Sequence, residues 1–490
     1  MYLGIDLGTS EVKVLLLASD GSVVGTAGTP FTVSRPKPRW SEQNPLDWWN
    51  GTRAALFALR DKFPREFAQV RGIGLSGQMH GAVLLDSEDQ VLRPAILWND
   101  MRSDKECDEL TERASELHQI AGNLAMPGFT APKLLWVQHN EPEIFNRTAC
   151  VLLPKDYLRL HLTGTKVSDP SDAAGTLWLD VARRDWSDEL LAACNMTRAQ
   201  MPALAEGSEP SGTLLPALAR ELGLRDGVVV AAGGGDNAAS AVGLGVVSPG
   251  QAFLSLGTSG VLFVVTDSFR PNPDRAAHAF CHCLPNTWHQ MSVMLSAASV
   301  LDWVAQLTGE HDLPRLVERA KARGVSRQSP VFLPYLSGER TPHNDPNARG
   351  VFFGIRADTD AADLTVAVLE GVALAFADGL DVLLEKGGSV GEVSVTGGGA
   401  RLPYWGELLA AALDRPLTYR VGGEVGAALG AARLAHLALG GASAQDVCLA
   451  PPVGRVVEPD ASLVSLLATR RRTFVRLYQD LKNTFVEYSA

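Results

Sequence analysis

A four-residue phrase occurs twice in this chain, and it limits the possible folds more than any other pattern. Leu-Gly-Thr-Ser stands at 7–10 and again at 256–259, near the middle of the 490 residues. Apolar residues flank both copies, which predicts a strand, a tight glycine turn and a second strand in each place. Such turns present backbone N–H groups and hydroxyls to phosphate oxygens. One turn in each half favours duplicated domains that face each other across a phosphate; two unrelated hairpins remain the alternative.

Length and charge narrow the class of protein. A chain of 490 residues is too long for one hydrophobic core, so two large domains are expected. The net charge of −11 argues against a broad surface for nucleic acid or anionic membrane, and we expect neither partner. The longest apolar stretch, from Val228, is interrupted by Asp236, which argues against a membrane span.

The cysteines and the N-terminus indicate a cytoplasmic protein. The six cysteines are scattered, and Cys281-His282-Cys283 is too tightly spaced for a usual zinc knuckle. We expect reduced, mostly buried thiols. The first predicted strand begins at Tyr2, which leaves no room for a signal peptide.

Strand-like and helical stretches alternate along the chain, which predicts an α/β fold. Apolar strands at 228–232 and 393–396 both run into triglycine turns, at 233–235 and 397–399. The tail from 461 to 488 has helical periodicity, with its three consecutive arginines expected on a solvated face, namely Arg470, Arg471 and Arg472.

Asp236 is the first candidate for chemistry, because it follows a buried strand and a glycine-rich turn. Ligands of α/β folds bind at the carboxyl ends of strands. A carboxylate placed there can orient an attacking hydroxyl and accept its proton in phosphoryl transfer. Asp and Asn also favour plain turns and helix caps, so a structural role for Asp236-Asn237 has similar weight from this loop alone.

Asp6 is the second candidate, because it interrupts an apolar strand beside the first glycine turn. A buried acid is costly unless a cation or hydrogen-bond donors face it, and Mg²⁺ is a natural partner beside phosphates. Lys13, across the predicted hairpin, could neutralise phosphate charge, although a surface lysine is the simpler interpretation.

Three further stretches are weak signals when taken singly. His80 follows a strand and could bind a sugar hydroxyl, although a structural histidine is the simpler interpretation. Trp98 to Arg102 combines an aromatic face with polar groups, which suits a sugar but also fits a core tryptophan and an ion pair. The glycines from 397 could hold a nucleotide or form a plain strand–helix turn. The sequence has neither a Walker-type phosphate loop nor the protein-kinase His-Arg-Asp motif.

Taken together, these motifs resemble the carbohydrate kinases named for a Phe-Gly-Gly-Tyr signature, in the actin/hexokinase/Hsp70 superfamily. Within that family the chain is similar to the bacterial xylulose kinases. The matching stretches extend nearly from end to end and lie at 4–10, 40–43, 77–81, 97–100, 126–136, 153–157, 168–169, 233–237, 256–260, 332–342 and 350–354.

The resemblance implies an α/β fold of two actin-like ATPase (ribonuclease H-like) domains, residues 1–241 and 242–490, with an interdomain cleft. It implies ATP- and Mg²⁺-dependent phosphorylation of D-xylulose to D-xylulose 5-phosphate by a cytoplasmic homodimer. The sugar would bind mainly to the first domain and ATP mainly to the second. A kinase for another ketose or polyol, such as ribulose, and a non-catalytic sugar sensor of the same fold are the alternatives.

The resemblance also implies residue roles. Asp236 matches the catalytic base, and Asp6 matches the metal side of the first phosphate loop. The residues implied near the sugar are Met79, His80, Trp98, Asp100 and Asn237. The residues implied for ATP are Thr9 and Lys13 in the first phosphate loop, Gly257, Thr258 and Ser259 in the second, and Gly398, Gly399, Ala400 and Tyr404 around the ribose and base.

Two positions depart from the family pattern. Glu11 stands where relatives usually have a small residue, and it would be strained if that turn needed a positive φ. Met101 replaces a usual glycine after Asp100. Neither position touches the expected base or sugar pair, so both bear on affinity and not on the reaction.

Overall fold

The computed structural model describes residues 1–422 and 426–489 and contains two large β-sheets. The first sheet has the order β13-β14-β5-β1-β2-β3, with β15 also paired to β5. Its strands are β1 (Tyr2–Leu7), β2 (Glu11–Leu17), β3 (Val23–Pro30), β5 (Gly72–Gly77), β13 (Pro210–Thr213), β14 (Val229–Ala231) and β15 (Gly234–Gly235).

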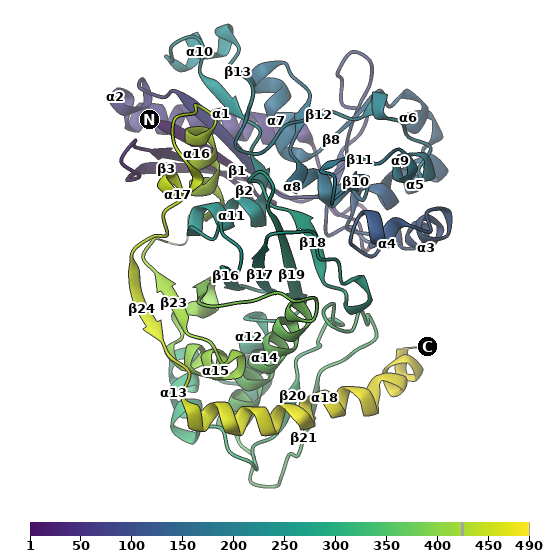
Figure 1. The fold of residues 1–490 in the computed structure, drawn as a ribbon. Helices are drawn as coiled ribbons and strands as arrows, with labels where there is room; N and C mark the ends of the chain where they lie inside the picture. The colour runs from purple at the N-terminus through teal and green to yellow at the C-terminus, as the bar shows by residue number, and fades with distance from the viewer. Residues whose placement is uncertain (423–425, 490) are drawn as a thin grey trace.

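The second sheet lies in the other half of the molecule and has the order β18-β19-β17-β16-β22-β23-β24. Figure 1 shows the first sheet, with its purple N-terminal strands, above the second sheet, whose strands run from teal to yellow. The strands of the second sheet are β16 (Ala252–Leu256), β17 (Gly260–Thr266), β18 (His278–Cys281), β19 (Trp288–Met294), β22 (Val393–Thr396), β23 (Leu417–Arg420) and β24 (Val453–Val457).

Both copies of the repeated phrase form the expected hairpins. β1 pairs antiparallel with β2 and parallel with β5, and β16 pairs in the same way with β17 and β22. The repeat therefore marks the same local arrangement at the centre of each sheet.

Shorter strands and the helices complete the fold. The small strands are β4 (Glu42–Gln43), β6 (Val83–Leu85), β7 (Ala95–Ile96), β8 (Cys150–Leu152), β9 (Val167–Ser168), β10 (Leu179–Asp180), β11 (Asp185–Trp186), β12 (Ala203–Leu204), β20 (Val331–Leu333) and β21 (Val351–Phe353). The helices of the first half are α1 (Pro45–Lys62), α2 (Pro64–Phe67), α3 (Asp104–Arg113), α4 (Leu117–Ile120), α5 (Thr130–Asn140), α6 (Pro142–Arg147), α7 (Pro154–Thr163), α8 (Pro170–Ala173), α9 (Asp188–Ala193) and α10 (Pro216–Leu222). The later helices are α11 (Asp236–Leu244), α12 (Ser299–Thr308), α13 (Leu313–Arg323), α14 (Ala361–Leu384), α15 (Pro403–Leu413), α16 (Gly426–Leu437), α17 (Ala444–Val447) and α18 (Ala461–Ser489).

Helix α16 is late in the sequence but packs on the first sheet, among the purple N-terminal elements of Figure 1. The contact is backbone against backbone: a Cβ on Gly4 would lie 1.9 Å from the carbonyl oxygen of Ala428, and one on Gly74 would lie 1.8 Å from that of Ala431. The same helix packs closely on α11, where a Cβ on Gly430 would lie 1.8 Å from the carbonyl oxygen of Ala239. Glycine is needed at these positions because any side chain would push the helix away.

The hydrophobic core follows the two sheets and also joins them. One cluster fills the first sheet and another fills the second. A third combines residues of the first half, such as Leu134 and Trp178, with Phe263 and Phe280 of the second sheet. The expected domain boundary at residue 241 falls within α11, between the last strand of the first sheet and the first strand of the second; its position stays a prediction.

The C-terminal helix α18 crosses the lower part of the molecule in Figure 1 and corrects one expectation. Arg470 is not solvated: it is 5% exposed, and its Nη2 donates to Oε2 of Glu370 on α14 at 2.7 Å. The prediction was wrong because the buried acid on α14 cannot be recognised from the sequence of α18. Arg472 is exposed, as expected.

No helix within residues 1–422 and 426–489 is long and apolar enough to cross a membrane. All six cysteines are buried and free, as expected.

Candidate active site

The predicted residues of the first half meet at one edge of the first sheet. β1 and β5 run parallel, and so do β5 and β15, with Asp6 and Gly234 both paired to Ser76. The carboxyl ends of these strands therefore bring Asp6, the segment after β5 and Asp236 to the same edge. This is the edge at which α/β sheets bind ligands.

Asp236 is the first residue of α11, and a tight turn at Gly233 connects strand β14 to the short strand β15 that precedes Asp236. Gly233 has φ +82°, and a Cβ there would lie 2.1 Å from the carbonyl oxygen of Leu75. Oδ1 of Asp236 accepts hydrogen bonds from the backbone nitrogen of Asn237 at 2.7 Å and from its Nδ2 at 3.0 Å. Oδ2 accepts none from the described residues, so one carboxylate oxygen is fixed and the other is available.

Burial and, to a smaller extent, the negative charge of Asp6 together raise the pKa of Asp236 to about 6. Burial also raises the pKa of Asp6 to about 6, against the lowering effect of nearby Lys13. Lys13 faces Asp6 in the β1–β2 register and forms an ion pair with Glu11 at 3.5 Å. Glu11 does not have a positive φ, so the strain considered for it is absent.

Thr9 is held in a hydrogen-bond network at the first glycine turn. Its Oγ1 donates to Oε1 of Gln78 at 2.8 Å and accepts from Nε1 of Trp98 at 2.9 Å. Its carbonyl accepts from Nε2 of Gln43 at 2.8 Å. Trp98 is 46% exposed, so its ring is anchored at the nitrogen and open on its apolar surface.

Met79 and His80 lie next to the turn that carries Asp236. A Cβ on Gly235 would be 2.9 Å from Sδ of Met79, so this side chain covers the turn. Nδ1 of His80 lies 2.7 Å from the carbonyl oxygen of Gly175, and its ring packs edge-on against Phe129. Because a carbonyl can only accept, Nδ1 carries the hydrogen and Nε2 is left as an acceptor. Burial lowers the pKa of His80 to about 3, so the ring is neutral.

Asp100 is placed differently from the other predicted sugar residues. It is fully buried, and it binds Nε and Nη2 of Arg102 at 2.9 and 2.7 Å as well as the backbone nitrogen of Ser41. Both of its oxygens are occupied by these contacts. The structure therefore brings together Asp6, Thr9, Met79, His80 and the Asp236 turn, and it leaves the Asp100 carboxylate in a buried ion pair.

The two predicted glycine turns of the second half also lie side by side. A Cβ on Gly397 would be 2.6 Å from the carbonyl oxygen of Leu256, and one on Gly399 would be 2.6 Å from the Leu256 side chain. Thr258 and Ser259 are exposed, and a Cβ on Gly398 would meet nothing within 4 Å. These turns at the ends of β16 and β22 form an open surface of backbone and hydroxyl groups.

Tyr404 does not lie on that open surface. It is 7% exposed and packs into the core of the second half near the start of α15. Burial raises the pKa of its hydroxyl to about 12. Ala400, by contrast, lies in the short 3₁₀ turn at Gly398–Arg401 directly after β22.

Sequence reasoning missed several residues that contact the predicted ones. Gln78 orients Thr9, and it lies between the strand and Met79. His278 accepts from Nη1 of Arg340 at 3.4 Å, and the positive charge of Arg340 contributes to the lowered pKa of His80. The stretch 332–342, which contains Arg340, matches the family pattern, but nothing in its local sequence indicates that Arg340 approaches His80 from the other half of the chain.

Family comparisons agree with this geometry. Residues 1–243 match the N-terminal domain of the FGGY family of carbohydrate kinases, and residues 252–439 match its C-terminal domain. The chain belongs to the FGGY family of carbohydrate kinases. The predicted family and enzyme class are thereby confirmed, and this FGGY chain has the expected two-domain, actin-like ATPase fold.

Individual relatives of this FGGY chain cover nearly its whole length. A xylulose kinase from Escherichia coli (strain K12) is 55% identical over 482 residues, which are 98% of this chain and 99% of the relative. A crystal structure of a xylulose kinase from Brucella ovis is 50% identical, with a TM-score of 0.96 and 99% of each chain covered. One from Rhodospirillum rubrum is 29% identical, with a TM-score of 0.92 and 99% of each chain covered.

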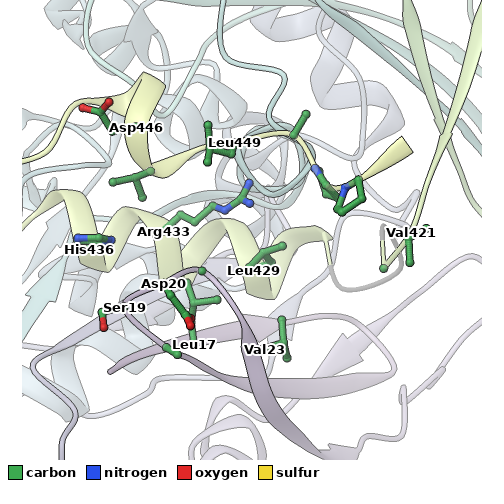
Figure 2. Close-up of a pocket in the computed structure, with 17 residues that line it drawn as sticks. Leu17, Ser19, Asp20, Val23, Val421, Leu429, Arg433, His436, Asp446 and Leu449 are labelled. Atoms are coloured by element: carbon green, nitrogen blue, oxygen red, sulfur yellow. The ribbon is translucent and has the colours of Figure 1, made fainter. Parts of the chain in front are cut away.

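A separate cavity of about 690 Å³ lies away from all these residues (Figure 2). It is lined by the β2–β3 turn, α16 and residues 446–447 and 449–452, and no predicted site residue lines it. Arg433 of α16 lines this cavity, and its Nη1 donates to the carbonyl oxygens of Val242 and Gly243 at 2.8 and 2.9 Å. Arg433 therefore caps the end of α11 opposite to Asp236.

Proposed function

We propose that this chain transfers the γ-phosphoryl group of ATP to the C5 hydroxyl of D-xylulose, giving D-xylulose 5-phosphate and ADP. The observation that supports this most directly is the Asp236 carboxylate beside Met79 and His80 at the carboxyl edge of the first sheet, with one oxygen that accepts no hydrogen bond within residues 1–422 and 426–489. The xylulose kinases that match the full chain favour this sugar over other ketoses.

Asp236 acts as the base in this proposal. Asn237 fixes one oxygen, so the other can orient the attacking hydroxyl and accept its proton. The transition state of phosphoryl transfer is loose, so the proton moves late and correct positioning supplies much of the rate. A pKa of about 6 lets the group be ionised near neutral pH yet remain basic enough to accept a proton.

The sugar is proposed to lie against the residues around this base. Neutral His80 offers Nε2 as an acceptor for a sugar hydroxyl, and Trp98 offers an open apolar face. Met79 and Asn237 flank Asp236. Asp100 is proposed to support this site through its ion pair with Arg102, whose guanidinium lies over the ring of Trp40 at 3.6 Å.

ATP is proposed to bind to the open turns of the second half and to the first glycine turn. The phosphate-binding residues are Thr9, Lys13, Gly257, Thr258 and Ser259, and those for ribose and base are Gly398, Gly399, Ala400 and Tyr404. Tyr404 supports this site from the core. Asp6 is proposed to lie on the metal side of the first phosphate loop, because a carboxylate beside phosphates suits Mg²⁺, which is held by few carboxylates together with phosphates and water. When bound, the ion would neutralise charge on the phosphates.

Closure of the two halves, domains 1–241 and 242–490, is proposed to bring the sugar and ATP together and to exclude water. The homodimer and the cytoplasmic location also stay predictions. Light scattering of the purified protein would give its molar mass in solution and so test the homodimer.

The test of the proposed function is ADP release from Mg·ATP with D-xylulose, D-ribulose, L-ribulose, L-xylulose, glycerol or no sugar. D-xylulose should give the strongest release. In Asp236→Asn, release should fall by about 10²–10⁴-fold because the base is lost. ADP binding, measured by calorimetry, should persist. Near-normal turnover in the variant would reject Asp236 as the base, and preference for another sugar would reject the role of Met79 and His80.

A further inference from the structure

A fully buried cluster of charges lies directly behind the Asp236 turn. Nζ of Lys155 on α7 is 2.6 Å from Asp156, 2.9 Å from Asp169 and 3.2 Å from Asp172, and all four side chains have no solvent exposure. The cluster touches β5, because a Cβ on Gly77 would lie 3.2 Å from Cβ of Lys155. Burial of charged groups costs desolvation free energy even when they are paired. Apolar residues would fill this space with a smaller loss of stability, so a role beyond packing is indicated.

One arm of the cluster reaches the residue before Asp236. Oδ2 of Asp169 accepts hydrogen bonds from the backbone nitrogen and the hydroxyl of Ser171. Oγ of Ser171 in turn accepts from the backbone nitrogen of Gly235 at 3.1 Å. A continuous chain of polar contacts thus runs from Lys155 through Asp169 and Ser171 to Gly235. It ends one residue before the base, Asp236.

The direction of these hydrogen bonds is fixed by chemistry. The backbone nitrogen of Gly235 can only donate, so Oγ of Ser171 accepts there, and the hydroxyl hydrogen of Ser171 points to Oδ2 of Asp169. A lone pair of the hydroxyl then remains for the N–H of Gly235. Lys155, which faces the other oxygen of Asp169, holds that carboxylate in place.

A second arm holds the strand that leads into the turn. Arg159, one helical turn after Lys155, is fully buried, and its Nη1 donates to the carbonyl oxygen of Ala231 at 2.7 Å. Its Nη2 donates to the carbonyl oxygen of Ala232. Hydrogen bonds from Arg159 and to Ser171 therefore fix the backbone on both sides of Gly233 and Gly234.

The cationic side chains of the cluster find their partners within it. Burial and the neighbouring carboxylates raise the pKa of Asp172 well above its usual range. Nζ of Lys155 contacts Asp156, Asp169 and Asp172, and Nη2 of Arg159 lies 3.6 Å from Asp156.

We propose that Ser171, held by Asp169 and Lys155, is a positioning residue that sets the location of the Asp236 carboxylate through the N–H of Gly235. The proposal rests on the proposed function, in which Asp236 is the base. A displacement of about 1 Å at a reacting group can cost about 10²-fold in rate. Ser171 should therefore affect the chemical step more than the binding of either substrate.

The test compares Ser171→Ala with a matched control, Ser168→Ala. Both serines are buried, but Oγ of Ser168 has no hydrogen-bond partner within the described chain. Ser171→Ala should lower kcat by about 10- to 100-fold, with KM for D-xylulose and for ATP within about twofold of the parent. Ser168→Ala should keep kcat within about twofold. A kcat of Ser171→Ala close to that of the parent, or an equal fall in both variants, overturns the proposal.

Ser171→Cys is the second variant, and it decides the case if Ser171→Ala does not fold. A thiol keeps an atom at the γ position but is a weaker acceptor, so kcat should lie between those of the parent and Ser171→Ala, at unchanged KM. Parental kcat in Ser171→Cys would overturn the proposal when the alanine variant is unfolded. Asp236→Asn is measured in parallel. A parent that is inactive on every sugar rejects the proposed function itself, whereas an active parent with an equally active Ser171→Ala rejects this inference alone.

Discussion

At the residue scale, the decisive feature is the pair of half-buried carboxylates, Asp6 and Asp236, at one edge of the first sheet. Asp236 is ionised only at the cost of desolvation and of repulsion by Asp6, which together raise its pKa to about 6. A group that exchanges protons in a reaction needs a pKa near the working pH, and Asp236 meets this condition. The pKa and the free oxygen of Asp236 therefore point to the same role.

This pKa predicts the pH dependence of the reaction. A base must be ionised, so kcat/KM should be constant above about pH 7 and should fall about tenfold per pH unit below about pH 6. Because Asp6 and Asp236 interact, the apparent pKa belongs to the pair. The measurement is initial-rate ADP release between about pH 4.5 and pH 8.5, with far-UV circular dichroism as the control for folding. Activity that stays constant down to pH 5 in folded protein would contradict the assignment.

At the element scale, α16 is the clearest example of what sequence alone does and does not predict. Strand–turn–strand units such as 4–15 are recognised because their apolar and glycine patterns are local. The carboxyl-edge position of Asp236 follows from the same logic. The docking of α16 on the first sheet could not be predicted, because it depends on glycines such as Gly4 and Gly74 that meet the helix only in the folded molecule.

The same limit applies to the site. Asp6, His80 and Asp236 were candidates because each follows or interrupts a predicted strand, whereas Met79 was implied only by the family resemblance. Ser171 and Arg340 were not assigned roles, because their partners are far away in sequence.

The close contact of α16 with α11 predicts a sharp effect of one methyl group. Gly430→Ala would place Cβ at 1.8 Å from the carbonyl oxygen of Ala239, so the helices must separate. We expect a loss of about 1–3 kcal/mol in unfolding free energy, despite the better helix propensity of alanine. Chemical denaturation measures this loss.

Gly426→Ala is the control on the same helix. A Cβ there would meet Ser240 at 3.6 Å, which is an ordinary contact. This variant should be as stable as the parent or slightly more stable. Equal stability of Gly430→Ala and Gly426→Ala would show that the helix contact tolerates more movement than its geometry implies.

At the scale of the whole molecule, α18 is fastened across the second half by a buried ion pair. Arg470 binds Glu370 on α14 and donates to the carbonyl oxygens of Ser326, Ser329 and Pro330 at 2.9, 3.0 and 2.9 Å. One side chain thus joins the C-terminal helix, the long helix α14 and the segment before β20.

Removal of this arginine should destabilise the protein strongly. Arg470→Met leaves Glu370 buried without its partner, which costs about 3–5 kcal/mol. In the parent protein, burial raises the pKa of Glu370, and the charge of Arg470 partly offsets this effect. Without Arg470, the pKa of Glu370 should therefore rise further. A raised folded-state pKa means that stability falls as pH rises, so the loss should be larger at about pH 8 than at about pH 5. Thermal unfolding at both pH values measures it.

Arg472→Met is the matched control for Arg470→Met, because Arg472 is exposed on the same helix. Its stability should change by no more than about 0.5 kcal/mol. Similar effects of the two substitutions would mean that the helix contributes through general charge and not through the buried pair.

The position of α16 also affects how the chain is made. The strands of the first sheet and α11 are complete by residue 244, but α16, which covers that sheet and α11, ends at residue 437. At about 5–20 residues per second, a ribosome needs roughly ten to forty seconds to synthesise the stretch between them. During that interval the glycine-lined face of the nascent first sheet is not covered by α16. We expect that chaperones cover this face, or that the sheet stays incompletely folded, until α16 has been synthesised.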